Sequence, residues 1–334
     1  GLSPAQALEL DRTAPLCGPF QKQMGCSSSV VIGDRSSVVQ CHLHEPAFAD
    51  VMAKEFKDDG LCPHSSSDNK DRFHGQFVLV QRLGRGASAT VYAVEPADVQ
   101  VDTRWSDVPE LAVKIVDLRK DASGEASGEA CPTRRSMARK ELKMMHQIGH
   151  SCNTISMEAW YLESHFVYIV VERASMTLLR YLEGAPDLSE EVLARVFTDM
   201  LTGISHVHRR NVVHRDVKPD NFLCFGPEST VKLCDFGLAE RLTSERRQLQ
   251  GIYGSAPFMS PEMLTKKRYD EKTDVWSFAS TAYVLLFGAW PYQPLDGTKN
   301  AMKAAIVAGV PAPKFRPPSS CAAVYAGFAC PALS

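Results

Sequence analysis

VVHRDVKPDNFLCFGPESTVKLCDFGL, residues Val212 to Leu238, is the stretch of sequence that decides the fold of this chain. It opens with His214-Arg215-Asp216, continues with Lys218 and Asn221, and reaches Asp235-Phe236-Gly237 after a short apolar run. An isolated tripeptide of either kind is a weak signal, because such residues also form ordinary turns. The three groups together, in this order and at this separation, predict a single functional site.

The stretch resembles the catalytic loop and the magnesium loop of protein kinases. The resemblance implies phosphoryl transfer, which depends on positioned groups and charge stabilisation and needs no covalent nucleophile. It places Asp216 opposite the substrate hydroxyl and Lys218 beside the transferring phosphoryl group. It also implies that Asn221 and Asp235 are the metal ligands for Mg²⁺, and that ATP is the phosphoryl donor.

Upstream of this stretch, strand-like alternation begins at Phe77 and flanks a glycine-bearing turn. The pattern predicts a hairpin that covers phosphates, because glycine lets backbone N–H groups approach phosphate oxygens. Ala89 stands where the family pattern has its third glycine, and we expect this departure to loosen the loop. The resemblance assigns nucleotide binding to Leu83, Gly84, Arg85, Gly86, Ala87, Ser88, Ala89, Thr90 and Val91.

The apolar run 111–116 predicts a strand that carries one lysine, Lys114. The resemblance assigns this lysine to the ATP phosphates. A lysine in an apolar strand needs a partner, and the helical pattern 137–148 offers Glu141, for which a solvated helix charge is the simpler alternative. Two further strands are predicted at Met157 and at 166–171. The resemblance also gives nucleotide-binding roles to Ala112, Glu172, Ala174 and Leu223.

The segment from Asp235 to Glu262 resembles an activation segment and a substrate-docking loop. The cation Arg215 beside Asp216 must be balanced, and a phosphate on the segment is one way to do so. The sequence does not choose among the candidate phosphorylation sites, which are Thr243, Ser244 and Tyr253. Arg241, Arg246 and Arg247 either assist or are solvated.

Substrate class and subgroup are indicated by further residues. Ser255 and Lys218 favour aliphatic hydroxyls over tyrosine. The segment 269–272 resembles the calmodulin-dependent and calcium-dependent protein kinase group. The sequence contains no Asp-x-Asp-x-Asp-Gly calcium loop, so calcium control is not predicted. The mostly apolar run 275–290 predicts a buried helix, and Asp274 stands at its start. In the family resemblance, this aspartate is expected to accept hydrogen bonds from the catalytic-loop backbone.

The whole pattern predicts an α+β, two-lobed protein kinase fold. A small antiparallel sheet with one helix is expected at 76–172 and a mostly helical lobe at 173–312, between a poorly ordered extension, 1–75, and an irregular tail, 313–334. The last helices of the family pattern are missing, and with them the arginine that pairs with Glu262. An unpaired buried carboxylate costs about 3–5 kcal/mol. We therefore expect both ends of this sequence to depart from the natural protein.

Composition limits the other classes of function. The chain has 334 residues, is 44% hydrophobic and carries a formal net charge of -2, so no global field draws it to nucleic acid. Its 10 cysteines are scattered, which favours a reducing, cytoplasmic location. If Met24 is the initiator, Gly25 and Cys26 fit a myristoylation and palmitoylation pattern that would attach the protein to a membrane surface. The alternative is a Ser-rich linker.

From these observations we predict an ATP- and Mg²⁺-dependent protein serine/threonine kinase that acts on protein substrates. One alternative is an ATP-binding pseudokinase that serves as a scaffold. It is disfavoured because a scaffold has no chemical need for all of the phosphoryl-transfer residues. Another alternative, a small-molecule kinase, is disfavoured by the docking loop at 255–262. The sequence leaves the oligomeric state open.

Overall fold

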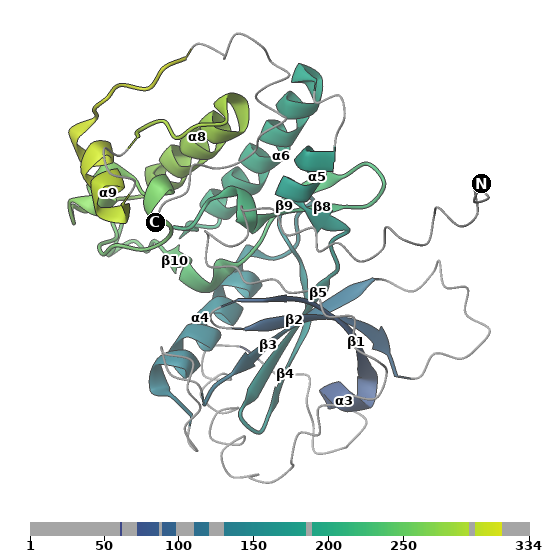
Figure 1. Ribbon diagram of the computed structural model, residues 1–334. Helices are drawn as coiled ribbons and strands as arrows, with labels where there is room; N and C mark the ends of the chain where they lie inside the picture. The colour runs from purple at the N-terminus through teal and green to yellow at the C-terminus, as the bar shows by residue number, and fades with distance from the viewer. Residues whose placement is uncertain are drawn as a thin grey trace, which may run out of the picture.

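The computed structural model describes residues 61, 72–86, 89–97, 110–119, 130–184, 189–293 and 298–315. Within these residues a five-stranded antiparallel sheet, in the order β1-β2-β3-β5-β4, forms the lower lobe in Figure 1. Its strands are β1 (Phe77–Arg85), β2 (Thr90–Pro96), β3 (Leu111–Asp117), β4 (Met157–Glu163) and β5 (Phe166–Glu172). The predicted hairpin and the three later strands are confirmed by this sheet.

Helix α4 (Pro132–Ile148) lies in the crossover from β3 to β4 and flanks the sheet (Figure 1). Proline at the first helical position suits a helix start, because its missing N–H has no helical partner there. The helix is longer than the predicted 137–148, and Met137, which the apolar spacing placed on the buried face, is exposed. The face that enters the core carries Ala138, Leu142 and Met145.

Ordered packing begins ahead of the sheet. The short helix α3 (Phe73–Gln76) lies within 1–75, the segment expected to be poorly ordered. Phe73 is fully buried, its ring stacks on Tyr168 with centroids 4.4 Å apart, and its N–H donates to Glu163. Leu61 is also buried in the core. For these residues the expected disorder is wrong, because aromatic burial against the sheet fixes them.

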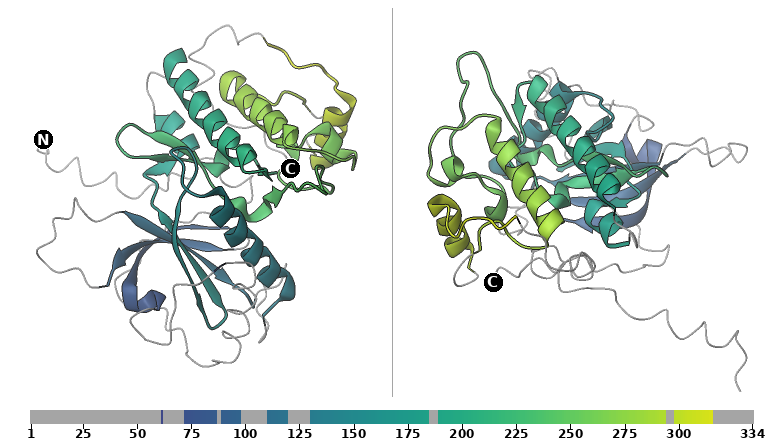
Figure 2. Two further views of the ribbon diagram at one scale, coloured as in Figure 1. Left: turned by 180° about the vertical axis from the view of Figure 1, so that it is seen from behind. Right: turned by 90° about the horizontal axis from the view of Figure 1, so that it is seen from above.

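The upper lobe is mostly helical. Its helices are α5 (Leu178–Gly184), α6 (Glu190–Arg209), α7 (Pro261–Leu264), α8 (Lys272–Phe287) and α9 (Lys299–Ala308). Helices α6 and α8 lie side by side in all views (Figures 1 and 2), and the rings of Phe197 and Phe278 meet edge to face between them. Helix α6 begins after Ser189, whose hydroxyl accepts a hydrogen bond from Val192 N and caps the helix. The two-lobed α+β fold is confirmed.

Helix α8 departs from the simple expectation of an apolar buried helix. Its buried face carries polar residues, among them Asp274, Ser277 and Thr281, whereas Val275 is half exposed. The hydroxyl of Ser277 donates to the Phe258 carbonyl oxygen, so this face binds the neighbouring loops through hydrogen bonds. Among the described helices, none has both the length and the apolar composition needed to cross a bilayer.

Small sheets and 3₁₀ turns hold the segments between α6 and α8. Strands β6 (Met176–Thr177), β8 (Phe222–Phe225) and β9 (Thr230–Leu233) form one sheet, and β7 (Val212–Val213) pairs with β10 (Glu240–Arg241). The 3₁₀ turns are η3 (Pro219–Asn221), η4 (Phe236–Leu238) and η5 (Ala256–Phe258). One hydrophobic core cluster contains both Ala112 of the lower lobe and Phe236 beside the catalytic loop, so packing is continuous between the lobes.

Some sequence predictions concern segments outside the described residues. These are the acylation pattern at Gly25 and Cys26, the loop positions Ala87 and Ser88, and the tail after Phe315.

The contact between α6 and the loop before β4 gives a test of the packing. A Cβ added at Gly203 would lie 2.3 Å from the Asn153 carbonyl oxygen, so Gly203→Ala forces two backbones apart. We expect it to lower the free energy of unfolding by about 1–3 kcal/mol, although helix propensity alone favours alanine by about 1 kcal/mol. Urea unfolding followed by circular dichroism measures the change.

Gly184→Ala in α5 is the matched control, because its added Cβ meets no atom within 4 Å. Equal loss of stability in both variants would contradict the close approach at Gly203.

Candidate active site

The loop after β7 gathers a carboxylate, a cation and a hydroxyl. The Lys218 ammonium lies 2.8 Å from Asp216 Oδ2 and 3.0 Å from Ser255 Oγ, and Ser255 Oγ donates to Asp216 Oδ1 at 3.2 Å. Asn221, at the end of η3, donates from Nδ2 to the Asp216 carbonyl oxygen at 2.7 Å and to its Oδ2 at 3.2 Å. The turn therefore returns Asn221 to the side of Asp216.

A buried carboxylate supports this loop from below. Asp274, at the start of α8, has a fully buried side chain and accepts hydrogen bonds from His214 N and Arg215 N, each at 2.8 Å. His208 Nε2 also lies 2.8 Å from Asp274 Oδ2. The loop N–H groups have no strand to pair with, so the carboxylate satisfies donors that burial would otherwise make costly. The expected role of Asp274 in holding the loop backbone is confirmed.

Three charged side chains meet where the two lobes face each other. The Lys114 ammonium of β3 lies 2.5 Å from Glu141 Oε1 of α4 and 3.0 Å from Asp235 Oδ1. Burial lowers the pKa of Lys114, but the two carboxylates outweigh burial and raise it, so the lysine is charged. The Lys114 ammonium holds the pKa of Asp235 at about 2. Glu141 is therefore the lysine's partner, and the alternative of a solvated helix charge is wrong.

The turn that carries Asp235 is held in an unusual backbone conformation. Asp235 has φ 62°, in the left-handed region, which non-glycine residues seldom occupy. A Cβ at Gly237 would lie 3.4 Å from Asp235 Oδ1 and 3.7 Å from Glu141 Oε2, so glycine leaves room for both carboxylates. The His214 ring packs against Phe236 and places Nε2 3.0 Å from the Cys234 carbonyl oxygen. These contacts tie the turn to the catalytic loop.

The same residues fit a magnesium ion. Asn221 donates through Nδ2, which leaves its Oδ1 to act as a ligand, and Asp235 uses Oδ1 for Lys114, which leaves Oδ2. Mg²⁺ prefers such oxygens and completes its shell with phosphate and water. Among the described residues no cluster of three or more His, Cys, Asp or Glu forms a metal cage. A site with so few protein ligands suits an ion that arrives with a nucleotide.

Most of the predicted nucleotide-binding residues lie on β1, β2 and β3 of the sheet lobe. Gly86 N donates to the Ala89 carbonyl oxygen at 2.9 Å and closes the turn between β1 and β2, in which Arg85 pairs with Thr90. Val91 and Ala112 contribute to one hydrophobic core cluster that also contains Val171. Leu83 is exposed, and Gly84 pairs with Val91 across the hairpin.

The segment after β5 is fixed by side-chain contacts that the sequence did not reveal. The Glu172 carboxylate accepts from Ser156 N at 2.9 Å and lies 2.5 Å from the Lys232 ammonium. Arg173 N donates to the Glu110 carbonyl oxygen. Ala174 follows, and Leu223 lies in β8, half buried. Glu172, one of the predicted nucleotide-binding residues, is therefore held from both lobes.

Comparison with protein families matches residues 77–322 to the protein kinase domain. This chain belongs to the protein kinase family. The matched region begins at β1 and includes every residue of the site described above, from Leu83 to Ser255.

Curated relatives of this kinase chain are 27–29% identical to it over the residues that align. The Aurora kinase of Schizosaccharomyces pombe is 27% identical over 260 residues, which cover 77% of this chain and 68% of that protein. The serine/threonine-protein kinase pak-1 of Caenorhabditis elegans is 29% identical over 227 residues, 68% of this chain and 36% of that protein. The serine/threonine-protein kinase fused of Drosophila melanogaster is 29% identical over 217 residues, 65% of this chain and 25% of that protein.

This kinase chain thus spans about two thirds of the first relative and about a third or a quarter of the other two. None of the three is named for calcium or calmodulin, so the narrower resemblance to that kinase group gains no support.

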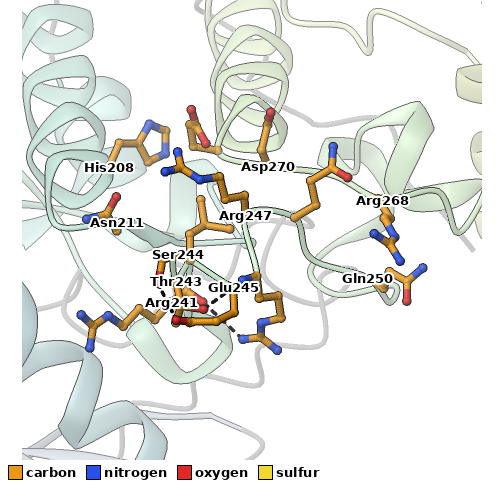
Figure 3. Close-up of a pocket in the computed structure, with 14 residues that line it drawn as sticks. His208, Asn211, Arg241, Thr243, Ser244, Glu245, Arg247, Gln250, Arg268 and Asp270 are labelled. Atoms are coloured by element: carbon orange, nitrogen blue, oxygen red, sulfur yellow. Dashed lines mark hydrogen bonds between the residues drawn. The ribbon is translucent and has the colours of Figure 1, made fainter.

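The activation segment of the kinase lies over an open cleft (Figure 3). The cleft is lined by Thr243, Ser244 and Arg247 of the segment, by His208 in the last turn of α6, and by Arg268 before α8. Thr243 N and Arg246 O are hydrogen-bonded, as are Arg246 N and Thr243 Oγ1, so this part of the segment forms a closed turn. None of the predicted nucleotide-binding residues lines this cleft.

Two features near the segment differ from expectation. Glu262 is only half buried, so the penalty expected for an unpaired buried carboxylate does not apply to it. Arg215 finds protein partners without a phosphate, including the Glu240 carboxylate at 3.6 Å. Sequence reasoning missed Glu240. The available signal was an isolated acid directly after Asp235-Phe236-Gly237-Leu238-Ala239 and ahead of several arginines.

The hydrogen bonds to Asp274 give a stability test. Asp274→Asn keeps the shape of the side chain but turns an NH₂ group toward a backbone N–H. We expect a loss of about 1–3 kcal/mol in the free energy of unfolding, read as a lower urea midpoint. In the control Asp270→Asn, the amide oxygen still accepts from Lys272 N, so the midpoint stays near that of the parent. Equal midpoints for the two variants would disprove the role of Asp274.

Proposed function

We propose that this chain transfers the γ-phosphoryl group of Mg·ATP to serine and threonine hydroxyls of proteins. One observation carries the proposal. Lys114, Glu141 and Asp235 form a chain of ion pairs from the β-sheet lobe to the turn beside the catalytic loop. In that loop, Lys218 and Asn221 both contact Asp216. Family membership and serine/threonine kinase relatives support the same reaction class.

Each residue has a part that follows from its chemistry. Asp216 orients the substrate hydroxyl and accepts its proton. Lys218, which contacts both Asp216 and Ser255, offsets negative charge as it develops at the phosphoryl group. Lys114 binds the phosphates as a point charge, and Glu141 keeps it in place. Bound Mg²⁺ neutralises phosphate oxygens, and Asn221 and Asp235 are the side chains that would hold it.

The nucleotide's base and loop contacts complete the proposal. The backbone of Glu172 and Ala174 is proposed to hydrogen-bond adenine, with Ala112, Val91 and Leu223 as the apolar walls. The glycine turn, 83–91, is proposed to cover the phosphates. The Ser255 hydroxyl, 3.0 Å from Lys218, lies where a serine or threonine side chain would approach and favours these over the longer tyrosine.

The competing function is a pseudokinase that binds ATP without transferring phosphate. Ala89 in place of a third glycine favours it slightly, but the ion pairs of Lys114 and the contacts of Asp216 are those that catalysis needs and scaffolding does not. Phosphate transfer to a generic basic protein therefore separates the two functions.

For the chemical step, we expect Asp216→Asn to lower kcat by about 10²–10⁴-fold, because the proton acceptor is lost. Transfer of labelled phosphate from Mg·ATP measures the rate, and circular dichroism checks the fold. ATP affinity should remain near that of the parent. A parent chain that binds ATP but transfers nothing, under conditions in which it is folded, would favour the scaffold.

Metal removal tests the assignment of Asn221 and Asp235. Chelation of divalent ions by EDTA should abolish transfer, and excess Mg²⁺ should restore it, because the ion neutralises the phosphate charge. In Asn221→Ala, the Mg²⁺ concentration that gives half-maximal rate should rise at least about 10-fold. This corresponds to a loss of about 1.4 kcal/mol in the free energy of Mg²⁺ binding. An unchanged Mg²⁺ requirement would remove Asn221 from the metal site.

A further inference from the structure

The guanidinium group of Arg215 is nearly sealed from solvent, with 3% of its side chain exposed. Its Nε donates to the Leu238 carbonyl oxygen at 2.7 Å, and the ring of Tyr253 lies 3.9 Å from the guanidinium carbon. These contacts satisfy donors but do not neutralise the charge. A buried cation next to a catalytic loop requires an anion.

That anion is the carboxylate of Glu240, on which cations from three separate elements converge. Lys140 of α4 lies 2.6 Å from Glu240 Oε2, Arg246 of the activation segment lies 2.8 Å from Oε1, and Arg215 lies 3.6 Å from Oε2. Glu240 itself is fixed by backbone pairing with Val213 in the β7–β10 ribbon. The carboxylate therefore sits at a set position relative to the catalytic loop.

Through α4, the contact between Glu240 and Lys140 is linked to Lys114, the lysine proposed to bind the phosphates. Lys140 precedes Glu141, whose carboxylate pairs with Lys114. A movement of α4 away from both the sheet and the helical lobe would break the Lys140–Glu240 and the Glu141–Lys114 pairs together. Glu240 thus joins the catalytic loop, the activation segment and the helix that positions Lys114.

The other arginines on and beside the segment do not converge on a second anion. In Figure 3 the side chains of Arg241, Arg247 and Arg268 point in different directions, Arg247 toward His208 and Arg268 toward Gln250. The cations that converge on one point are those around Glu240. Burial raises the pKa of Glu240, but hydrogen bonds from Lys140 and Arg246 and the charge of Arg215 hold it below its usual value, so the group is ionised at neutral pH.

We propose that Glu240 is a positioning residue whose carboxylate supplies the negative charge that a phosphorylated activation segment would otherwise supply, so that the unphosphorylated chain already holds α4 in the active arrangement. This inference rests on the proposed kinase function. Glu240 touches neither substrate nor nucleotide, and it acts through Lys140 and Arg215.

The test compares Glu240→Gln with Glu245→Gln in the full chain after phosphatase treatment, with mass spectrometry to show that no phosphate remains. Gln has nearly the size of Glu but no charge. Glu245 is the matched control because it lies on the same segment, is exposed, and accepts hydrogen bonds from its own turn, including one from the adjacent Ser244 hydroxyl. Both variants and the parent are assayed for kcat and for KM for ATP.

We expect the phosphatase-treated parent to keep its kcat within about threefold, because the buried cation remains neutralised. Glu240→Gln should lower kcat about 10-fold, equivalent to about 1.4 kcal/mol, with KM for ATP changed less than about twofold, because only positioning is affected. Lys140→Met combined with Glu240→Gln should be no slower than Glu240→Gln alone, since both changes break one contact. Glu245→Gln should match the parent.

Other results would overturn the inference. It is wrong if dephosphorylation lowers the parent's kcat more than about 10-fold, if Glu240→Gln matches Glu245→Gln, or if the Lys140 and Glu240 effects simply add. If the parent transfers no phosphate at all, the proposed function fails separately. In that case, hydrogen exchange of the α4 amides tests whether Glu240 holds α4 in place. Faster exchange in Glu240→Gln than in the parent supports this role, and equal exchange contradicts it.

Discussion

A carboxylate without access to solvent, that of Asp274, holds the backbone of the catalytic loop through two hydrogen bonds of 2.8 Å. The loop belongs to no regular sheet at this point, so its N–H groups depend on a side chain from α8 for their partners. Because α8 lies beside α6 and its polar face is buried, the loop is attached to the packed interior of the helical lobe. The positions of Asp216, Lys218 and Asn221 all follow from this attachment.

The second constraint is the ion pair between Lys114 and Glu141, which comes from two elements of the sheet lobe but completes its contacts only through Asp235 of the other lobe. A buried lysine that lost both of these carboxylates would keep an uncompensated charge, which is costly in a buried site. The relative position of the two lobes is therefore fixed by the ion pairs of Lys114 as well as by the apolar core that the lobes share.

Much of this arrangement could be predicted from the sequence because it depends on short separations. One tight turn brings Asn221 back to Asp216. The alternation of apolar and polar residues in β1 and β2 is typical of a hairpin, and these two strands do pair. The predictions from sequence were wrong or incomplete where a residue contacts segments that are distant in the chain. Phe73 looked like part of a polar extension until the sheet supplied Tyr168 to stack upon, and Glu240 binds residues 140, 215 and 246, which no local pattern connects. Glu262 was expected to be buried from a family pairing, yet its own surroundings leave it half exposed.

The hydroxyl of Ser255 has a further consequence. It donates to Asp216 Oδ1 while Lys218 contacts Oδ2, so both carboxylate oxygens are oriented before any substrate arrives. Rotation of the Asp216 side chain is restricted in the folded chain itself. The entropy that fixes this carboxylate has already been given up during folding, so a group that docks against it loses only its own freedom.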